Sequence, residues 1–469
     1  MVGTANNVGG ALPAAATAGS GNSALTYTAT TSGAAGNSIR VRLIGGKPNT
    51  TLSVTVVDRL VSITLSTDND GAPTNKASEI ITGITAHNEA NALLTVSLAS
   101  GSDGTGTVRD TAVFSLAGGR DEPYPINTPV IINTSAAAAA LGNIGTLPAA
   151  VGDVWRTSGL NAATVIVVRV DAGEDDATTL ANVIGDKVTR TGIYSLLDAS
   201  SETGKTPAII AATGHTDNLA AAFALQSTAE DLGGVAIVDV SGATFNDAIG
   251  YGSRLGSCYA VWPSINVYDA NAGEVVARPP SALVAGHIAR VDGDEGWHNS
   301  PSNRPISDVL SATTPVDFEI NNPNSTANIL NQEYITTVVR RDGGVYLWGN
   351  RLVNGTLITH RRVERIIGKA LGEYVADWID RNVDIPFIDF VLTRFNNFLR
   401  DQTVRGNLTG GEATFDPAQN TADSLAANRV TFSVALGIAN VAEHIIIQQR
   451  VTDIYNEQII AEASRRSAA

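Results

Sequence analysis

The middle of the chain carries four short, continuous apolar runs, and these constrain its fold more than any other feature. The runs are ATVIVVRV (163–170), PAIIAA (207–212), GVAIVDV (234–240) and CYAVW (258–262). A helical stretch, NLAAAFALQSTAEDL (218–232), lies between the second and the third. Strands buried on both faces read as unbroken apolar runs, and parallel strands need crossover connections between them. Residues 122–305 are therefore predicted to form an α/β domain around a mainly parallel sheet.

The first third of the chain follows a different pattern, in which apolar and polar residues alternate over short segments between Gly, Asn and Asp turns. The segments are ALTYTA (24–29), SIRVRL (38–43), TLSVTV (51–56), VSITL (61–65), LTVSL (94–98) and AVFSL (112–116). Period-two alternation predicts sheets with one buried face, as in a sandwich. One helix is expected within this β-rich part, over residues 75–94.

Residues 306–469 are predicted to form an α+β domain. Two helices are expected over residues 360–380, where apolar residues recur three and four apart, and over 387–400, directly after Pro386. Strands are expected over RVTFSVAL (429–436) and EHIIIQQRV (443–451), before a polar tail.

The search for chemistry finds no catalytic, cofactor-binding or metal site. The six histidines form no H-E-x-x-H pair, and no G-x-S-x-G elbow occurs. Gly204-Lys205-Thr206 looks like the end of a phosphate loop, but Ala199 stands where the loop needs glycine, and the apolar run at 208–211 predicts a strand where a helix is required. The acidic clusters at 171–176 and 292–298 match no complete calcium loop, and solvated loops are expected there.

Charge and composition exclude further classes. The net charge of −15 argues against a general nucleic-acid binder. The single cysteine, Cys258, lies in an apolar setting that suits a buried thiol and a cytoplasmic protein. No run approaches the roughly 18 apolar residues of a membrane span, which argues against membrane insertion.

One basic stretch departs from the acidic whole: residues 340–369 hold seven Arg or Lys and two Asp or Glu. Four of these cations lie at the start of the first predicted helix, where the helix dipole disfavours them by about 0.3–1 kcal/mol each when exposed. An anionic partner surface would explain the arrangement, and a solvated face with local ion pairs would explain it equally well.

Several segments, taken together and in order, are specific. They include PINTPVIINTSAAAAALGNIGTLPAAV, the A-G-x-x-A-R-x-D string from Ala285 to Asp292, the Asn-Ile-Leu-Asn string from Asn328 to Asn331, and Gly344 with Trp348-Gly349. Over about residues 122–469 the chain resembles contractile phage tail sheath proteins.

This resemblance implies a non-enzymatic structural subunit of the virion tail, assembled in the host cytoplasm. Such subunits form six-membered rings stacked helically around a tail tube, in an extended metastable state that contracts without nucleotide hydrolysis. The implied partners are further copies of the chain, the tube protein, and baseplate and tail terminator proteins, without direct contact to nucleic acid or membrane. The implied layout is 1–7, a remnant of the first core strand; 8–121, a β-rich insertion or decoration; 122–305, the core; and 306–469, the inner domain with a polymer-linking C-terminal arm.

The resemblance also suggests contact residues. Terminal arms of such sheaths add strands to a neighbour's C-terminal sheet. The inter-subunit strand candidates are Glu443, His444, Ile445, Ile446, Ile447, Val451, Ile454 and Tyr455. A helix of the inner domain touches the tube, and either predicted helix qualifies. The tube-contact candidates are Arg361, Arg362, Arg365, Lys369, Arg394, Arg400 and Arg405. The family usually has an arm before a strand that ends like Val2–Ala5, so either that arm is missing ahead of Met1 or other segments link the subunits.

Two other classes stay open from the sequence. A virion surface decoration or receptor-binding protein would suit the β-rich first third. A virion-associated hydrolase would need a compact set of His, Asp and Ser, which the sequence does not suggest.

Overall fold

The computed structural model describes residues 1–6, 9–159, 163–270 and 272–467. The chain divides into two compact units, Met1–Arg365 and Ile366–Ala469. The expected limit between residues 7 and 8 and the last two residues of the polar tail lie outside the described residues. The other expected domain limits, after residues 121 and 305, stay predictions.

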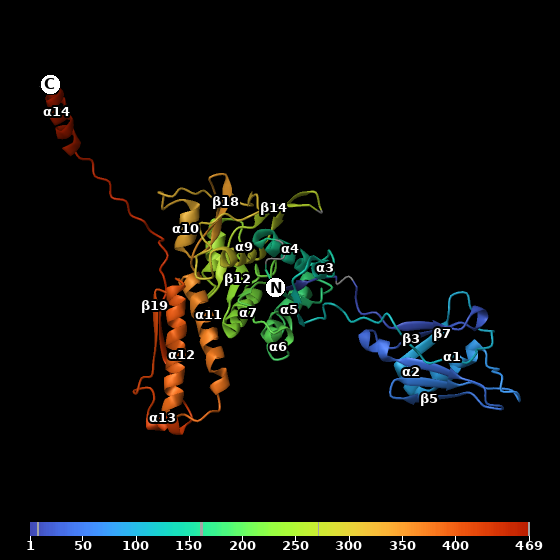
Figure 1. The fold of residues 1–469 in the computed structure, drawn as a ribbon. Helices are drawn as coiled ribbons and strands as arrows, with labels where there is room; N and C mark the ends of the chain where they lie inside the picture. The colour runs from blue at the N-terminus through green and yellow to red at the C-terminus, as the bar shows by residue number, and fades with distance from the viewer. Residues whose placement is uncertain (7–8, 160–162, 271, 468–469) are drawn as a thin grey trace. The chain divides into compact units, whose positions relative to one another are not determined.

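Outside its β-rich part, the first unit is built around a sheet made of two three-stranded parts, of which strand β12 is labelled in Figure 1. The first part has the order β1-β10-β9, and its strands are β1 (Val2–Thr4), β9 (Pro129–Ile132) and β10 (Val165–Val170). The second has the order β11-β12-β13, with all pairs parallel, and its strands are β11 (Ile209–Ile210), β12 (Val235–Asp239) and β13 (Tyr259–Val261). The Val2 amide donates to the Ala211 carbonyl at 3.1 Å and joins the two parts. The predicted mainly parallel sheet is present, with β9 as an antiparallel strand.

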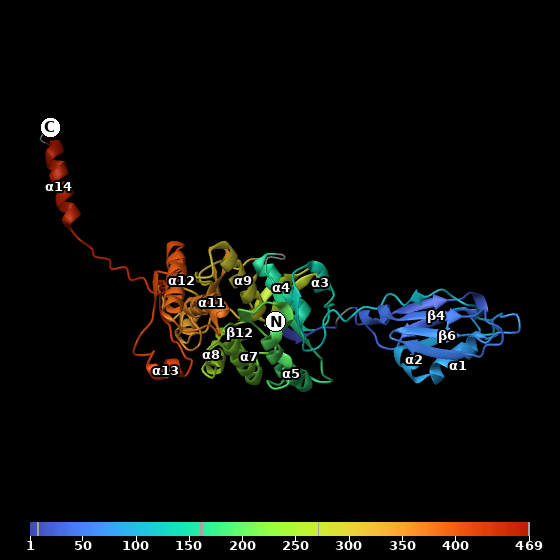
Figure 2. The same ribbon diagram turned by 60° about the horizontal axis from the view of Figure 1, so that its bottom comes forward.

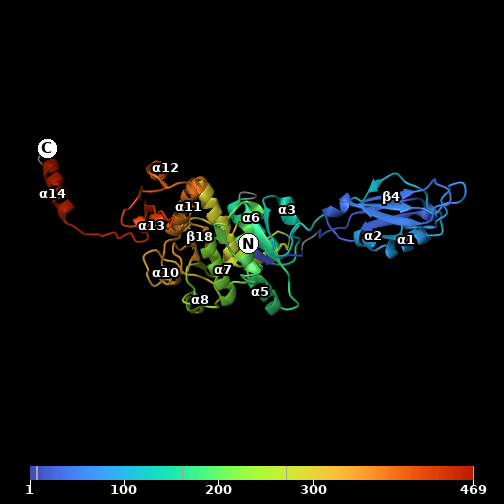
Figure 3. The same cartoon turned by 90° about the horizontal axis from the view of Figure 1, so that it is seen from below.

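Helices cover both faces of this sheet, as Figures 2 and 3 show. In β12, Val235 and Ile237 face one core, and Ala236 and Val238 face the other. The helices that build these cores are α4 (Thr146–Ser158) and α9 (Pro280–Asp294) on one side, and α5 (Asp176–Ile184), α7 (Leu219–Leu232) and α8 (Phe245–Gly252) on the other. Burial on both faces is the reason why these strands read as continuous apolar runs.

Short elements complete this part. The helices are α3 (Ser135–Ala139), α6 (Ala199–Thr203) and α10 (Thr326–Gln332), and the strands are β14 (Ile265–Asp269), β15 (Glu274–Arg278), β16 (Ser311–Ala312), β17 (Thr337–Arg341) and β18 (Gly344–Trp348). Gly204 ends α6 in a left-handed conformation (φ 69°) and β11 follows, so the glycine-lysine-threonine stretch lies between a helix and a strand. This order is the reverse of a phosphate loop, as predicted.

The β-rich part of the first unit has a core of its own. Its two sheets have the orders β2-β3-β7 and β5-β6-β4-β8. Their strands are β2 (Ala15–Ala18), β3 (Leu25–Ala29), β4 (Arg40–Ile44), β5 (Ser53–Val57), β6 (Leu60–Thr64), β7 (Leu94–Leu98) and β8 (Phe114–Ser115). The single predicted helix is in fact two, α1 (Ala77–Ala86) and α2 (Asn88–Leu93), because the His87 ring accepts a hydrogen bond from the Ala90 amide and caps a new helix.

The second unit contains a helical hairpin and a small sheet. Its elements are the second part of α11 (Ile358–Val375), α12 (Ile385–Val404), β19 (Gly410–Thr414), α13 (Ala422–Ala426), β20 (Ser433–Gly437) and α14 (Ile454–Ser467). Asn396 holds α12 against β19, donating to the Ala413 carbonyl at 3.0 Å and accepting from its amide at 2.8 Å. Phe432 packs edge-on against Phe387 and Phe395 and anchors the start of β20.

The prediction of a strand over residues 443–451 is wrong for the single chain, which has neither helix nor strand between β20 and α14. Ile454 and Tyr455 begin α14 instead of continuing a strand. The physical reason is that a strand needs a second strand to satisfy its backbone donors and acceptors. The run of three isoleucines in the segment is visible in the sequence, but the presence of a partner strand is not.

Candidate interaction surfaces

The C-terminal tail, defined here as residues 438–467, carries large apolar side chains that are open to solvent. Ile445, Ile446 and Ile447 are 78–85% exposed, and no residue of α14 is buried. Contiguous apolar side chains of this size are rarely left in water on a finished assembly. The tail is therefore an exposed apolar surface, and it includes all eight predicted inter-subunit strand residues.

The first set of predicted tube-contact cations lies at the start of α11, and most of it is used within the chain. Arg362 is only 5% exposed and its guanidinium pairs with Asp292. Arg361 lies 4.0 Å from Glu364, and Arg365 is half-buried beside Gly233. The basic residues that precede α11 also form internal bonds: Arg340 with the Leu310 carbonyl, Arg341 with Asn303, and Arg351 with the Gly355 carbonyl. The Arg361–Glu364 pair fits the solvated alternative, whereas Arg362 fits neither alternative, because it is buried and its partner Asp292 lies 70 residues away.

The second set lies on and after α12 and is exposed. The Arg394 guanidinium lies over the Tyr374 ring at 5.0 Å, and such a contact leaves the charge accessible. Arg400 bonds its helix neighbour Asn397, and Arg405 pairs with Asp401 at 2.8 Å. These three arginines, together with exposed Lys369, remain available for an anionic partner.

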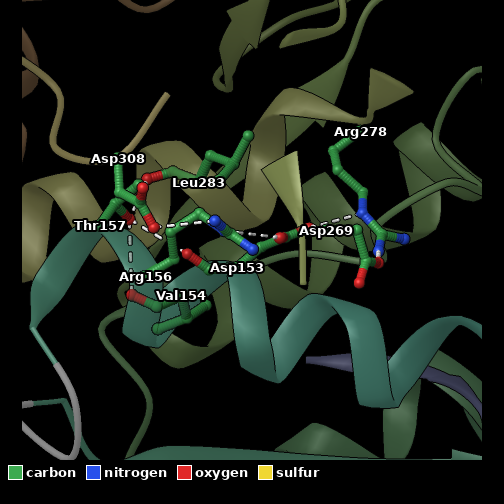
Figure 4. Close-up of polar contacts among 8 residues, drawn as sticks. All are labelled: Asp153, Val154, Arg156, Thr157, Asp269, Arg278, Leu283 and Asp308. Atoms are coloured by element: carbon green, nitrogen blue, oxygen red, sulfur yellow. Dashed lines mark hydrogen bonds and ion pairs between the residues drawn. The ribbon is translucent and has the colours of Figure 1, made fainter. Parts of the chain in front are cut away.

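An ionic network around one buried carboxylate, which the sequence analysis did not foresee, joins α4 to the β14–β15 hairpin (Figure 4). Its centre is the buried Asp153 carboxylate, 3.6 Å from Arg156 Nε and 3.8 Å from Arg278 Nε. Arg156 continues to Asp308 at 2.8 Å, and Arg278 to Asp269 at 2.6 Å. Burial raises the pKa of Asp153 to about 6, and the two arginines oppose that rise. Removing Arg278 would leave the buried Asp153 carboxylate with less compensating charge, so this pair stabilises the contact between α4 and the hairpin.

A second buried carboxylate, Asp239, lies at the carboxyl end of β12. It accepts hydrogen bonds from the Gly214 amide, the Thr216 hydroxyl, and the amide and hydroxyl of Ser281, at 2.7–3.3 Å. Burial raises the pKa of Asp239 to about 6, and the Ser281 and Gly214 hydrogen bonds partly offset this effect. Because the group is buried and its donors come from the loop after β11 and from the first turn of α9, it ties the start of α9 to the sheet. The sequence signal was only an aspartate inside an apolar run.

The residues with reactive side chains are used structurally. Burial raises the pKa of the Cys258 thiol to about 12, and burial lowers the pKa of His287 to about 4. His287 donates to the Pro301 carbonyl at 2.9 Å. Within the described ranges no group of three or more His, Cys, Asp or Glu is arranged to hold a metal ion. Among the same residues, none of the helices has the length and apolar character to cross a membrane.

Comparison of the sequence with known proteins finds one family. Residues 186–351 match the model of the phage tail sheath protein central domain. A prophage major tail sheath protein of Pseudomonas aeruginosa strain UCBPP-PA14 is 29% identical over 71% of this chain and 88% of its own length. The tail sheath protein of Escherichia phage P2 is 24% identical over 73% of this chain and 90% of its own.

Solved structures show the same fold. The helical sheath of the anti-feeding prophage in its contracted state aligns with a TM-score of 0.54 at 18% identity, covering 69% of this chain and 88% of that one. The fold and the matched sequences define a non-enzymatic structural protein of contractile tails. The chain belongs to the phage tail sheath protein family, and it is a contractile tail sheath subunit of a phage or prophage.

Proposed function

We propose that the chain polymerises by adding residues 443–451 as a strand to the β19–β20 sheet of a neighbouring copy, within six-fold rings stacked helically around a tail tube. One observation carries this proposal: Ile445, Ile446 and Ile447 are exposed in the single chain and lie within ten residues of the end of β20, in a sheet of two strands. The ends of the polymer would meet baseplate and tail terminator proteins, and contraction would draw on subunit packing alone.

The energetics favour strand addition. The β19–β20 sheet packs on α12, and a third strand would satisfy backbone groups along its open edge. Successive side chains of an added strand point to opposite faces, so Ile445 and Ile447 would pack on one face and Ile446 on the other. Each isoleucine fully buried in this way contributes about 1.5–3 kcal/mol.

The test replaces both isoleucines of one face by aspartate, Ile445→Asp with Ile447→Asp, and examines the purified chain by negative-stain microscopy. The parent should form rings or tubes, and the variant should remain folded and unassembled. Val188→Asp is the matched control, because Val188 is exposed but lies outside the tail. Normal polymer from the double variant would contradict strand addition.

We also propose that the tail tube is held electrostatically by α12 and the residue after it, because Arg394, Arg400 and Arg405 are exposed. Such pairs set register and are screened over about 8 Å at physiological ionic strength. Arg394→Glu with Arg400→Glu should weaken co-sedimentation with tubes, most clearly at low salt, and spare self-assembly. Arg361→Glu with Arg365→Glu is the comparison set. Unchanged binding by both at every salt concentration would place the tube contact elsewhere.

A further inference from the structure

The connection between α11 and α12 forms a surface that is both acidic and apolar. The described part of the chain leaves its apolar side chains exposed. We call residues 376–389 the hairpin tip. Its side chains Ile379, Val383 and Ile385 are 45–75% exposed. Four aspartates and one arginine give the tip a net charge of −3. Apart from the tail, the described part of the second unit exposes only two other large apolar side chains, Val404 and Leu425.

The helix α14 presents a surface of the opposite kind. Tyr455, Ile459 and Ala463 follow one another at four-residue spacing and lie on one face, with Ile460 at its margin. All four are exposed. Arg466 continues the same face, and Arg465 lies beside it at the end of the helix; both pair with the exposed Glu462 one turn earlier, at 3.2 Å and 3.9 Å respectively. An aromatic and aliphatic face that ends in two arginines complements an apolar surface rimmed by aspartates.

The path of the tail brings these two surfaces together in neighbouring copies. The start of β20 lies at the hairpin tip, because Phe432, directly before β20, contacts Phe387 with ring centroids 6.2 Å apart. A strand added antiparallel to β20 runs toward that end of the sheet. Residues 443–451 would therefore finish beside the tip, and two residues later α14 begins.

We propose that α14 docks on the hairpin tip of the neighbouring copy that receives the tail strand, with Tyr455 and Ile459 against Val383 and Ile385. The second copy is thereby held at two places, by the strand and by the helix. This inference rests on the proposed strand addition, since the strand determines where α14 begins.

Disulfide trapping tests the contact in assembled polymer. One chain carries Ile459→Cys and the other Val383→Cys; they are mixed, assembled and oxidised, and a covalent dimer is sought on a non-reducing gel. Cys258 is fully buried, so the parent chain serves as the uncross-linked background. Val404→Cys, at the opposite end of α12, replaces Val383→Cys as the matched control. A dimer that requires both cysteines at 459 and 383 is expected, whereas equal trapping at 404, or none at 383, would overturn the proposal.

Trypsin gives a second readout without new cysteines. In parent polymer, cleavage after Arg465 and Arg466 should be slowed at least several-fold relative to the unassembled chain, and Ile459→Asp should abolish that protection while polymer still forms. The two proposals can fail separately. If the Ile445 and Ile447 double variant loses polymer, but chains with cysteines at 459 and 383 assemble without cross-linking, strand addition is supported and helix docking is wrong. If Ile385→Asp instead abolishes tube co-sedimentation and leaves the cleavage of α14 unchanged, the tip is a tube contact and the proposal is wrong.

Discussion

Replacing Gly286 by alanine should destabilise the core at the crossing of α4 and α9. A Cβ atom at this position would lie 2.1 Å from the Val154 carbonyl oxygen and 2.2 Å from the Thr157 hydroxyl oxygen. Neither atom can move freely, since one belongs to the backbone of α4 and the other donates a hydrogen bond to the Leu283 carbonyl at 2.7 Å. Carbon and oxygen normally approach to about 3.3 Å, so the two helices must separate by about 1 Å.

The expected loss combines three effects. Overpacking costs about 1–3 kcal/mol. Loss of the Thr157–Leu283 hydrogen bond costs about 1 kcal/mol. Alanine returns up to about 1 kcal/mol through its better helix propensity. The free energy of unfolding should therefore fall by about 2 kcal/mol, which corresponds to a lowering of Tm by about 4–8 °C.

The same helix provides the control. Gly293 has nothing within 4 Å of the position that a Cβ would take, so Gly293→Ala gains helix propensity without a clash. Thermal unfolding of both variants, followed by circular dichroism on unassembled chain, gives the comparison. Gly293→Ala should match or exceed the parent, and a Gly286→Ala variant of equal or higher Tm would refute the argument from close packing.

Three further predictions follow from the structure. Because burial raises the folded-state pKa of Asp239 to about 6, above its usual value, this group should make the free energy of unfolding rise by about 1 kcal/mol from pH 7 to pH 5, and chemical denaturation of Asp239→Asn should lack that rise. Calorimetric titration should detect no ATP binding, because the order of α6 and β11 is the reverse of a phosphate loop. Micromolar affinity for ATP that disappears in Lys205→Ala would show that this stretch binds phosphate after all. Residues 11–118 have their own core, so a variant that lacks them should still form rings or tubes visible by microscopy. If that variant folds but forms no polymer, residues 11–118 carry lattice contacts.

The sequence alone was sufficient wherever the signal is local. Continuous apolar runs predicted β10, β12 and β13, and three-and-four spacing predicted α11, because burial imposes its period on each element separately, while Pro386 marked the start of α12. The misleading glycine-lysine-threonine stretch could likewise be dismissed from its immediate neighbours.

Long-range partners were beyond that reasoning. Arg362 looked like a free cation until the fold placed Asp292, 70 residues away, beside it. The Asp153 network joins residues as far apart as Arg156 and Asp308, and only the pair Asp153 and Arg156 has a recognisable spacing. Each partner in such a pair is ordinary in the sequence, and only their placement in three dimensions makes the pair.

The sequence by itself thus determined the type of most elements and, through its resemblance to known sheaths, the expectation of a polymer. The tertiary structure decided which charges are buried, where β1 enters the central sheet, and that residues 443–451 have no partner strand within the chain. The physical reason is that periodicity reports which side of an element meets apolar surroundings, whereas pairing depends on which distant segment arrives there.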